Sequence, residues 1–387
     1  MNSIKQQLSV SSQPVKKNIL IIFAIIMVFL SACNTPEKVL KNADPNYKYT
    51  KAMEWYNKGA YYKAIPVFEE LMGLYKGVET VEEIYYYYCM AQYNQGSYIV
   101  AAYHFKQYTV QHPYSQYAEE ALFMHAECYD QQSPKSSLDQ SETYNAIDAY
   151  QNFINAYPSS ERITYCNDKI DELRQKLEDK ALAAADLYYR TKNYRAAAFA
   201  YKNLLISYPD VDGSEDIQYK IVESYYKYAE QSIIKKQQER FEETIAAADN
   251  FLSRYETSEY FSLVEDVKEQ SHYDAIQSSF EYAMNFIAEK RVDKLDEVVN
   301  VYDVHTTSIN DEKLKKDAKE VLEEMYFQKI KTNFEHAQES VEAERRDLYN
   351  ATIDAYYNFN QKYSNSKFTK EADKIFNASE KNLKKLS

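Results

Sequence analysis

The residues whose chemistry could drive a reaction are few and poorly placed. The chain has six histidines among 387 residues, and none stands at metal-ligand spacing from a partner. His125-Ala126-Glu127 has the His-x-Glu spacing of zinc-dependent deaminases, but the Pro-Cys-x-x-Cys that completes such a site is absent. No His-Glu-x-x-His motif, nucleophile elbow or glycine-rich phosphate loop occurs. We therefore expect no catalytic site, metal or cofactor, and we interpret residues 125–127 as part of a helix surface.

The N-terminal segment indicates a covalent modification of Cys33. Lys16 and Lys17 precede an apolar run from Ile19 to Leu30, which is shorter than the roughly 20 residues of a spanning helix. Leu30-Ser31-Ala32-Cys33 resembles the lipobox of bacterial lipoproteins, which implies cleavage before Cys33 and acylation of its thiol and amine. An ordinary signal peptide and an uncleaved anchor are the alternatives. We predict a signal peptide over residues 1–32 and a lipidated tether over residues 33–45.

Charge and the residues after Cys33 narrow the location and the partners. Asn34 stands where enteric lipoproteins carry the Asp that favours inner-membrane retention, and no acidic run resembling a surface-export tag follows. We expect a lipid anchor in the outer membrane, on the periplasmic face. Removing residues 1–32 removes three lysines and no acid, so the net charge moves from −13 to −16. An acidic surface argues against nucleic acid as a partner.

Three cysteines remain after the tether. Their odd number does not indicate a disulfide framework, and Cys89 and Cys128 occupy small-residue positions of expected helices. We expect buried, unreactive thiols.

The elements that would position any site are helical hairpins, because the chain repeats a pattern at an offset of 37 residues. Such a period is typical of stacked helical repeats, which usually bind proteins. The first copy comprises Tyr49, Met53, Tyr56, Asn57, Gly59, Tyr61, Ala64 and Phe68, and the second comprises Tyr86, Met90, Tyr93, Asn94, Gly96, Tyr98, Ala101 and Phe105.

A small residue, an aromatic residue and a closing Pro mark the second helix of each hairpin. Ala101 is followed twelve residues later by Pro113, and two further repeats keep this distance, Ala146 to Pro158 and Ala197 to Pro209. The stretch from Gly59 to Phe68 resembles the tetratricopeptide consensus. The expected fold is therefore all-α, a tetratricopeptide-like helical-hairpin solenoid.

The later repeats are longer. A polar loop is expected over residues 131–143, and Ile163, Cys166, Ile170, Leu173 and Leu177 form an apolar helical stripe after it. Residues 275–330 look helical, interrupted by a polar segment over 304–311.

A second duplication has an offset of 108 residues and relates 229–270 to 337–378. We predict N-terminal repeats over 46–230 and C-terminal helical repeats over 231–387.

The first helices of the hairpins carry the candidate binding groove. In this repeat class they face the concave surface, and aromatic and Met side chains give an adaptable apolar lining. The alternative is that these side chains pack between adjacent hairpins. The predicted groove comprises Tyr49, Met53, Tyr56, Asn57, Tyr86, Met90, Tyr93, Asn94 and Phe123.

The lipobox, a short polar linker and repeats from about residue 46 together resemble the BamD-type lipoproteins of the outer-membrane β-barrel assembly machinery, in their Bacteroidetes branch. The resemblance rests on residues 38–41 and 47–49, on residues 138–147 from Leu138-Asp139-Gln140 onward, and on two C-terminal runs, 353–357 and 363–368. It covers residues 33–230 and 337–385, and it leaves 231–336 as an additional block.

The resemblance implies a non-enzymatic scaffold. It would hold the barrel insertase BamA through its periplasmic POTRA domains and receive unfolded barrel precursors in the groove. One alternative is a cell-envelope tetratricopeptide adaptor that coordinates peptidoglycan and division proteins. Another is a glycan-capturing surface lipoprotein, although the single Trp55 gives little of the usual sugar platform.

Overall fold

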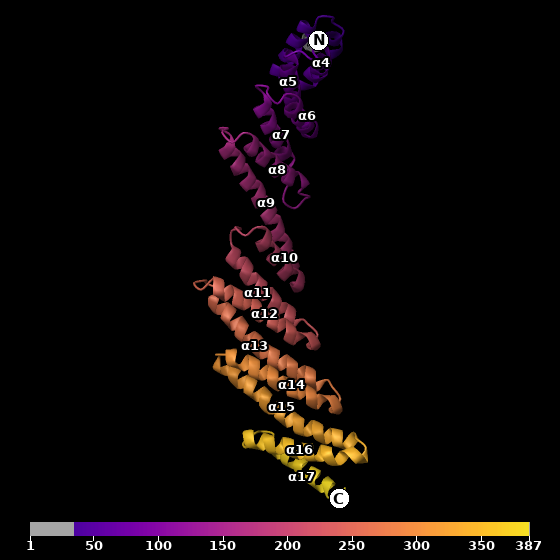
Figure 1. Ribbon diagram of the computed structural model, residues 1–387, viewed down its shortest axis with the longest axis vertical. Coiled ribbons are helices and arrows are strands. Elements are labelled where there is room, and N and C mark those ends of the chain that lie inside the picture. Colours follow the sequence, from indigo (N-terminus) through magenta and orange to yellow (C-terminus); the bar gives the residue numbers. More distant parts are fainter. Residues whose placement is uncertain (1–34, 387) are drawn as a thin grey trace, which may run out of the picture. The chain divides into compact units, whose positions relative to one another are not determined.

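The computed structural model describes residues 35–386, and all the regular elements in that range are helices. Cys33 and the predicted signal peptide lie outside the described residues. The chain divides into two compact units, Met1–Leu177 (unit 1) and Glu178–Ser387 (unit 2), and the division falls inside α9 (Figure 1). The prediction of an all-α fold of tetratricopeptide-like hairpins is confirmed. The predicted boundary at residue 230 divides the N-terminal repeats from the C-terminal helical repeats. It is a different kind of boundary from the one between the two units, and it stays a prediction.

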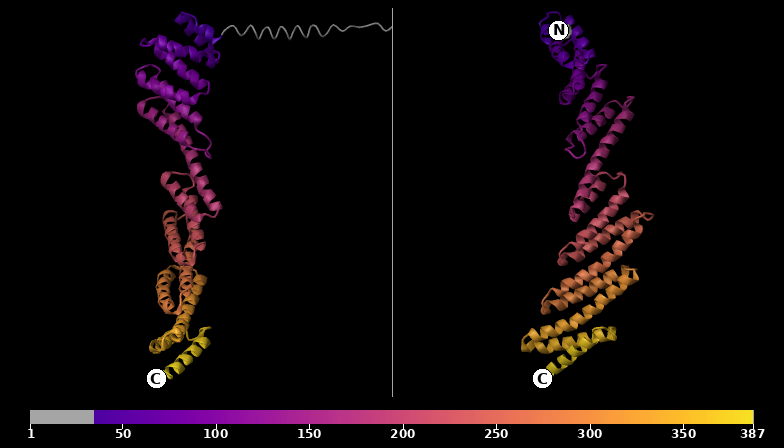
Figure 2. Two further views of the ribbon diagram at one scale, coloured as in Figure 1. Left: turned by 90° about the vertical axis from the view of Figure 1, so that its right-hand side faces the viewer. Right: turned by 180° about the vertical axis from the view of Figure 1, so that it is seen from behind.

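From α2 to α8 and from α10 to α17, helices that follow one another in the chain pack against each other (Figure 2), and buried residues of α9 share core clusters with α8 in unit 1 and with α10 in unit 2. The helices of unit 1 are α2 Pro36–Leu40, α3 Pro45–Asn57, α4 Tyr61–Leu74, α5 Thr80–Asn94, α6 Tyr98–Gln111, α7 Ala118–Gln132, α8 Ser141–Ala156 and the first part of α9 Ile163–Arg190. The rest of α9 opens unit 2, which continues with α10 Tyr194–Ser207, α11 Ser214–Glu230, α12 Ile234–Arg254, α13 Phe261–Met284, α14 Ala288–His305, the short 3₁₀ helix η2 Thr306–Ser308, α15 Glu312–Glu339, α16 Glu342–Lys362 and α17 Thr369–Leu383.

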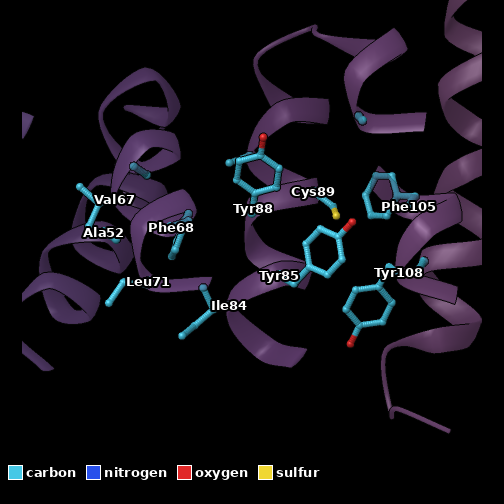
Figure 3. Packing of buried hydrophobic residues seen from close by; sticks show 14 of the residues in the cluster. Ala52, Val67, Phe68, Leu71, Ile84, Tyr85, Tyr88, Cys89, Phe105 and Tyr108 are labelled. Carbon is cyan, nitrogen blue, oxygen red and sulfur yellow. The ribbon is translucent and has the colours of Figure 1, made fainter. Parts of the chain in front are cut away.

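The small and aromatic positions found in the sequence form the hairpin cores. Ala64 and Phe68 are fully buried, and so are the equivalent Ala101 and Phe105. The small residue lets two helices approach closely, while the aromatic ring fills the space beside it. Figure 3 shows Phe68 and Phe105 packed among their neighbours. The chain leaves the helix just before Pro113, Pro158 and Pro209, as predicted.

The turns inside the hairpins explain the repeated glycines. Gly59 follows α3 with φ +73°, its N–H bonds to the Tyr56 carbonyl at 2.9 Å, and the next N–H reaches Trp55 at 2.8 Å. Gly96 ends α5 in the same way, with φ +84°. In the turn between α9 and α10, the same geometry is held by Lys192 at φ +60°, a conformation that costs a side chain about 1–2 kcal/mol.

The predicted polar loop is shorter than expected and is held in place. Helices α7 and α8 take both ends of the predicted range, so the irregular part runs from Ser133 to Gln140. The buried amide of Gln140 donates to the carbonyls of Lys135 and Leu138 at 2.9 and 3.0 Å, and Thr143 donates to the Gln140 Oε1 at 2.7 Å. These hydrogen bonds explain why a Gln and a Thr occur in the sequence run that begins at Leu138.

The three cysteines are free and buried, as expected for Cys89 and Cys128. In Figure 3 the Cys89 sulfur lies beside the ring of Tyr85. Burial raises the pKa of the Cys89 thiol, and it raises that of Cys128 to about 12 and that of Cys166 to about 11. The thiolate, which is the reactive form, is therefore disfavoured at all three positions.

The C-terminal duplication is visible as repeated structure. Helices α12 and α16 begin and end 108 residues apart, and Thr244 and Thr352 are buried at equivalent positions. The interruption predicted after residue 304 is confirmed, because α14 ends at His305 and α15 begins at Glu312.

Candidate functional site: a half-buried aromatic face in unit 1

The predicted groove residues are neither fully buried nor freely exposed. Seven of them are half-buried and pack against the hydrophobic core clusters of unit 1. The other two, Asn57 and Asn94, are exposed at the ends of α3 and α5. We call these seven the aromatic face. They are Tyr49, Met53 and Tyr56 on α3, Tyr86, Met90 and Tyr93 on α5, and Phe123 on α7.

Ring contacts join α3 to α5. Tyr56 meets Tyr87 edge-to-face at 5.2 Å between ring centroids. Tyr87 in turn lies 5.5 Å from Tyr86. The Tyr49 hydroxyl donates to Glu83 Oε1 at 3.0 Å, so that a carboxylate also lies at the edge of the face. The structure thus brings the two predicted sets of residues together, with Tyr87 between them.

Tyr56 and Tyr93 also have a packing role inside their own hairpins. Tyr56 contacts Tyr61, the first residue of α4, at 5.4 Å, and Tyr93 contacts Tyr98 at 5.3 Å in the same geometry. Tyr189, which precedes the equivalent turn in unit 2, contacts Tyr194 at 5.4 Å. The contact therefore belongs to the hairpin in general. Only the part of each ring that is not packed across its own turn is available to a ligand on the aromatic face.

The phenols of the face remain neutral hydrogen-bond donors at physiological pH. Burial raises the pKa of Tyr56 to about 12 and that of Tyr93 to about 12. Burial, followed by the hydrogen bond to Glu83, raises the pKa of Tyr49 further. The neutral hydroxyls can donate hydrogen bonds to backbone carbonyls of a ligand, and the ring surface beside them can contact its aromatic side chains.

At α7 the aromatic face is partly covered by charged and polar side chains. The Arg162 guanidinium lies 4.4 Å from the centre of the Phe123 ring and is paired with Glu120. Tyr165 lies 5.6 Å from Phe123 and donates to Glu127 Oε1 at 3.0 Å. Phe123 is therefore covered by groups from α9 and from the turn before it, and the ring is less accessible than the sequence suggested.

Sequence reasoning missed these covering groups, although a signal for them exists. The signal lies in the turn that follows the second helix of a hairpin. A Ser in this turn is followed two residues later by a side chain that covers an aromatic ring on the first helix of the same hairpin. Tyr117 stacks on Tyr86 at 4.4 Å with an interplanar angle of 13°. Ser115-Gln116-Tyr117 and Ser160-Glu161-Arg162 share this spacing, so Arg162 occupies the position of a stacking aromatic residue.

The His125-Ala126-Glu127 run has a packing role, and its interpretation as helix surface is wrong. His125 Nδ1 donates to the Ala102 carbonyl at 2.9 Å, and Glu127 is buried, where it accepts a hydrogen bond from Tyr150. Within residues 35–386 no group of three His, Cys, Asp or Glu side chains is arranged to hold a metal ion.

Comparison with known proteins identifies the family. The sequence model of a family described as YfiO, outer membrane lipoprotein, matches residues 41–241, which is more than half of the chain. The chain belongs to this family. The match spans all of the aromatic face and ends inside α12, so most of unit 2 lies beyond it.

Individual relatives are distant. A protein of Aquifex aeolicus, provisionally named outer membrane protein assembly factor BamD, is 23% identical over 242 residues, 62% of this chain and 78% of its own length. The outer membrane protein assembly factor BamD of Caulobacter vibrioides is 26% identical over 108 residues, 28% of this chain and 35% of that relative. Among solved structures, the TPR2AB domain of yeast Sti1 in complex with pHSP90 is similar at a TM-score of 0.30 and 11% identity, over 73% of this chain and 98% of that one. No helix within the described residues is long and apolar enough to cross a membrane.

Proposed function

We propose that this protein is a lipid-anchored, non-enzymatic scaffold of the outer-membrane β-barrel assembly machinery. Membership of the YfiO outer membrane lipoprotein family supports this role, and so do the two relatives named as BamD assembly factors. The anchor would be the acylated Cys33, which would hold the protein at the periplasmic face of the outer membrane.

The aromatic face is the proposed receiving site for unfolded barrel precursors, and it is the observation that carries the proposal. Such precursors typically end in a strand with aromatic side chains. The remaining ring surfaces of Tyr56 and Tyr93 offer edge-to-face and stacking contacts, each worth about 0.5–1.5 kcal/mol beyond the buried area. The exposed amides of Asn57 and Asn94 lie next to these rings and can bond an extended backbone.

The C-terminal repeats of unit 2 are proposed to bind the POTRA domains of a BamA-type insertase. This assigns two different partners to two different units, which is what a scaffold requires.

The proposal is tested by purifying tagged full-length protein from native membranes in mild detergent and identifying stoichiometric partners by mass spectrometry. We expect a barrel protein with POTRA domains. Peptidoglycan or division proteins in its place would overturn the assembly role while leaving the fold and family untouched.

A further inference from the structure

The duplication in unit 2 creates the same groove twice, with different linings. The first groove is lined by residues of α10, α11 and α12, and the second is lined by residues of α14, α15 and α16. Seven lining residues of the first groove correspond at the 108-residue offset to lining residues of the second, among them Ala247 to Ala355, Asn250 to Asn358 and Ile221 to Lys329. The two sites are therefore equivalent in position and can be compared residue by residue.

The floors of the two grooves differ in their side chains, in both directions, since Gln218 of the first corresponds to Tyr326 of the second. Ile221 and Tyr225 in the first are replaced by Lys329 and Asn333 in the second. The volume is about 490 Å³ in the first groove and about 250 Å³ in the second. Ile221 is 3% exposed and packs in the core of its hairpin, whereas the half-buried Tyr225 presents apolar ring surface to the groove.

The wall of the first groove carries exposed apolar surface and unpaired positive charge. Ile206 lies at the rim and is 68% exposed, and Phe199, seven residues earlier on α10, is 65% exposed. Lys202, Arg254 and Glu243 also line the groove, and neither of the two cations forms an ion pair with another described residue. Two cations against one carboxylate leave the charged lining net positive, in a chain whose net charge is −13.

We propose that the α10–α11–α12 groove binds an amphipathic helix of a partner protein, with acidic residues along the edge that faces Lys202 and Arg254. The walls and floor are helices, whose backbone groups are already bonded internally and cannot pair with an extended strand. A helix satisfies its own backbone groups and needs only an apolar stripe against Ile206 and Tyr225. Helix α10 has 14 residues, which matches about four turns of a bound helix.

The experiment places a photoreactive phenylalanine derivative at residue 206 in the full-length protein in native membranes, followed by mapping of the crosslinked segment. Ile206 is exposed, so the replacement should not affect folding. The matched control is the same replacement at Ile287, which is 64% exposed at the start of α14 and outside the groove. A double charge reversal, Lys202→Glu with Arg254→Glu, is tested in the residue-206 variant.

We expect one crosslinked segment with apolar residues at helical spacing and a negative net charge. Its yield should fall about tenfold on charge reversal, since close charge pairs at interfaces contribute on this scale. Crosslinking to a second copy of this chain, to lipid, or to a segment without helical apolar spacing would overturn the proposal. So would a yield at residue 206 no higher than at residue 287, or one that charge reversal leaves unchanged.

Discussion

Ser258 and Glu215 form a hydrogen bond that joins the turn before α13 to helix α11 of the preceding hairpin. The Ser258 oxygen also accepts the backbone N–H of Tyr260 at 2.9 Å, and Tyr260 stacks on Tyr219 at 4.5 Å. The same set of contacts recurs 108 residues later, where Ser366 bonds to Glu323 and Phe368 stacks on Phe327 at 4.6 Å. A single serine thus orients the turn and positions the ring that connects two hairpins.

Replacing Ser258 with Ala should therefore weaken unit 2. The substitution removes a charge-assisted hydrogen bond and the acceptor for a turn N–H, so the free energy of unfolding should fall by about 1–2 kcal/mol. Urea denaturation followed by circular dichroism measures this change. Ser253→Ala is the matched control, because Ser253 is exposed and bonds only within α12. Equal effects of both substitutions would show that the connection between the hairpins contributes little.

Lys192→Gly should stabilise the protein. Lys192 holds a left-handed conformation at φ +60°, and glycine adopts it without the steric cost of a Cβ atom. We expect the free energy of unfolding to rise by about 1 kcal/mol. Gly96→Ala tests the same argument in reverse: a Cβ there would meet no atom within 4 Å, so any loss of stability must come from the backbone. Lower stability of Lys192→Gly would mean that the Lys side chain makes contacts that outweigh the strain.

The sequence predicted the hairpins but only part of the aromatic face. Gly59 and Gly96 are visible because a left-handed residue favours glycine, and Ala64 and Ala101 are visible because close helix packing requires small residues. These are local requirements that the sequence alone displays.

The covering of Phe123 could not be predicted in the same way. It depends on Arg162, which precedes α9 by one residue and lies 39 positions away from Phe123 in the chain. An arginine in a turn ordinarily indicates a solvated charge, and only the packed structure shows its guanidinium over the ring. The groove beside α10 escaped notice for a similar reason, because its lining comes from three helices at once.

A buried histidine pair should make unit 2 sensitive to acid. His272 on α13 and His305 on α14 are buried, and their Nδ1 atoms lie 2.8 Å apart, so one donates to the other. Burial and the neighbouring His305 lower the pKa of His272 from 6.5 to about 4, and burial also lowers the pKa of His305. The other charged groups that face the pair are Lys268, Asp249 and Glu269 towards His272 and Glu242 towards His305.

Because the folded pKa lies below the unfolded value, the unfolded chain binds the proton first as the pH falls. The stability contributed by neutral His272 is complete above pH 6.5 and is lost as the pH falls towards 4. Between pH 7.5 and 5.5 the free energy of unfolding should fall by about 1.4 kcal/mol through this residue. His272→Leu should remove this part of the pH dependence, measured by urea denaturation at both pH values. An unchanged pH dependence in His272→Leu would assign it to other groups.

Replacing Cys33 with Ala should release the protein from the membrane. The acyl chains are the predicted anchor, and each buried methylene of such a chain contributes about 0.8 kcal/mol to membrane binding. Membrane fractionation and immunoblotting should find the variant in the soluble periplasmic fraction. Cys89→Ala, which alters a buried thiol, should remain membrane-bound. If unlipidated protein persists in the outer membrane, contacts with partners are sufficient to hold it there.

The double substitution Tyr56→Ala with Tyr93→Ala should weaken binding of a barrel-precursor peptide. It removes one ring from the α3 part of the aromatic face and one from the α5 part, so we expect the Kd of a labelled peptide with aromatic C-terminal residues to rise at least about tenfold. Fluorescence anisotropy measures the Kd, and circular dichroism confirms that helicity is retained.

Tyr189→Ala is the matched control, because Tyr189 makes the same contact across its turn, with Tyr194, but lies in unit 2. It should lower stability without changing the Kd. An unchanged Kd in the double variant, or an equal loss in Tyr189→Ala, would mean that the rings only fill space between helices. That result would remove the aromatic face from the proposed function, whereas the partner test with the full-length protein would remain independent of it.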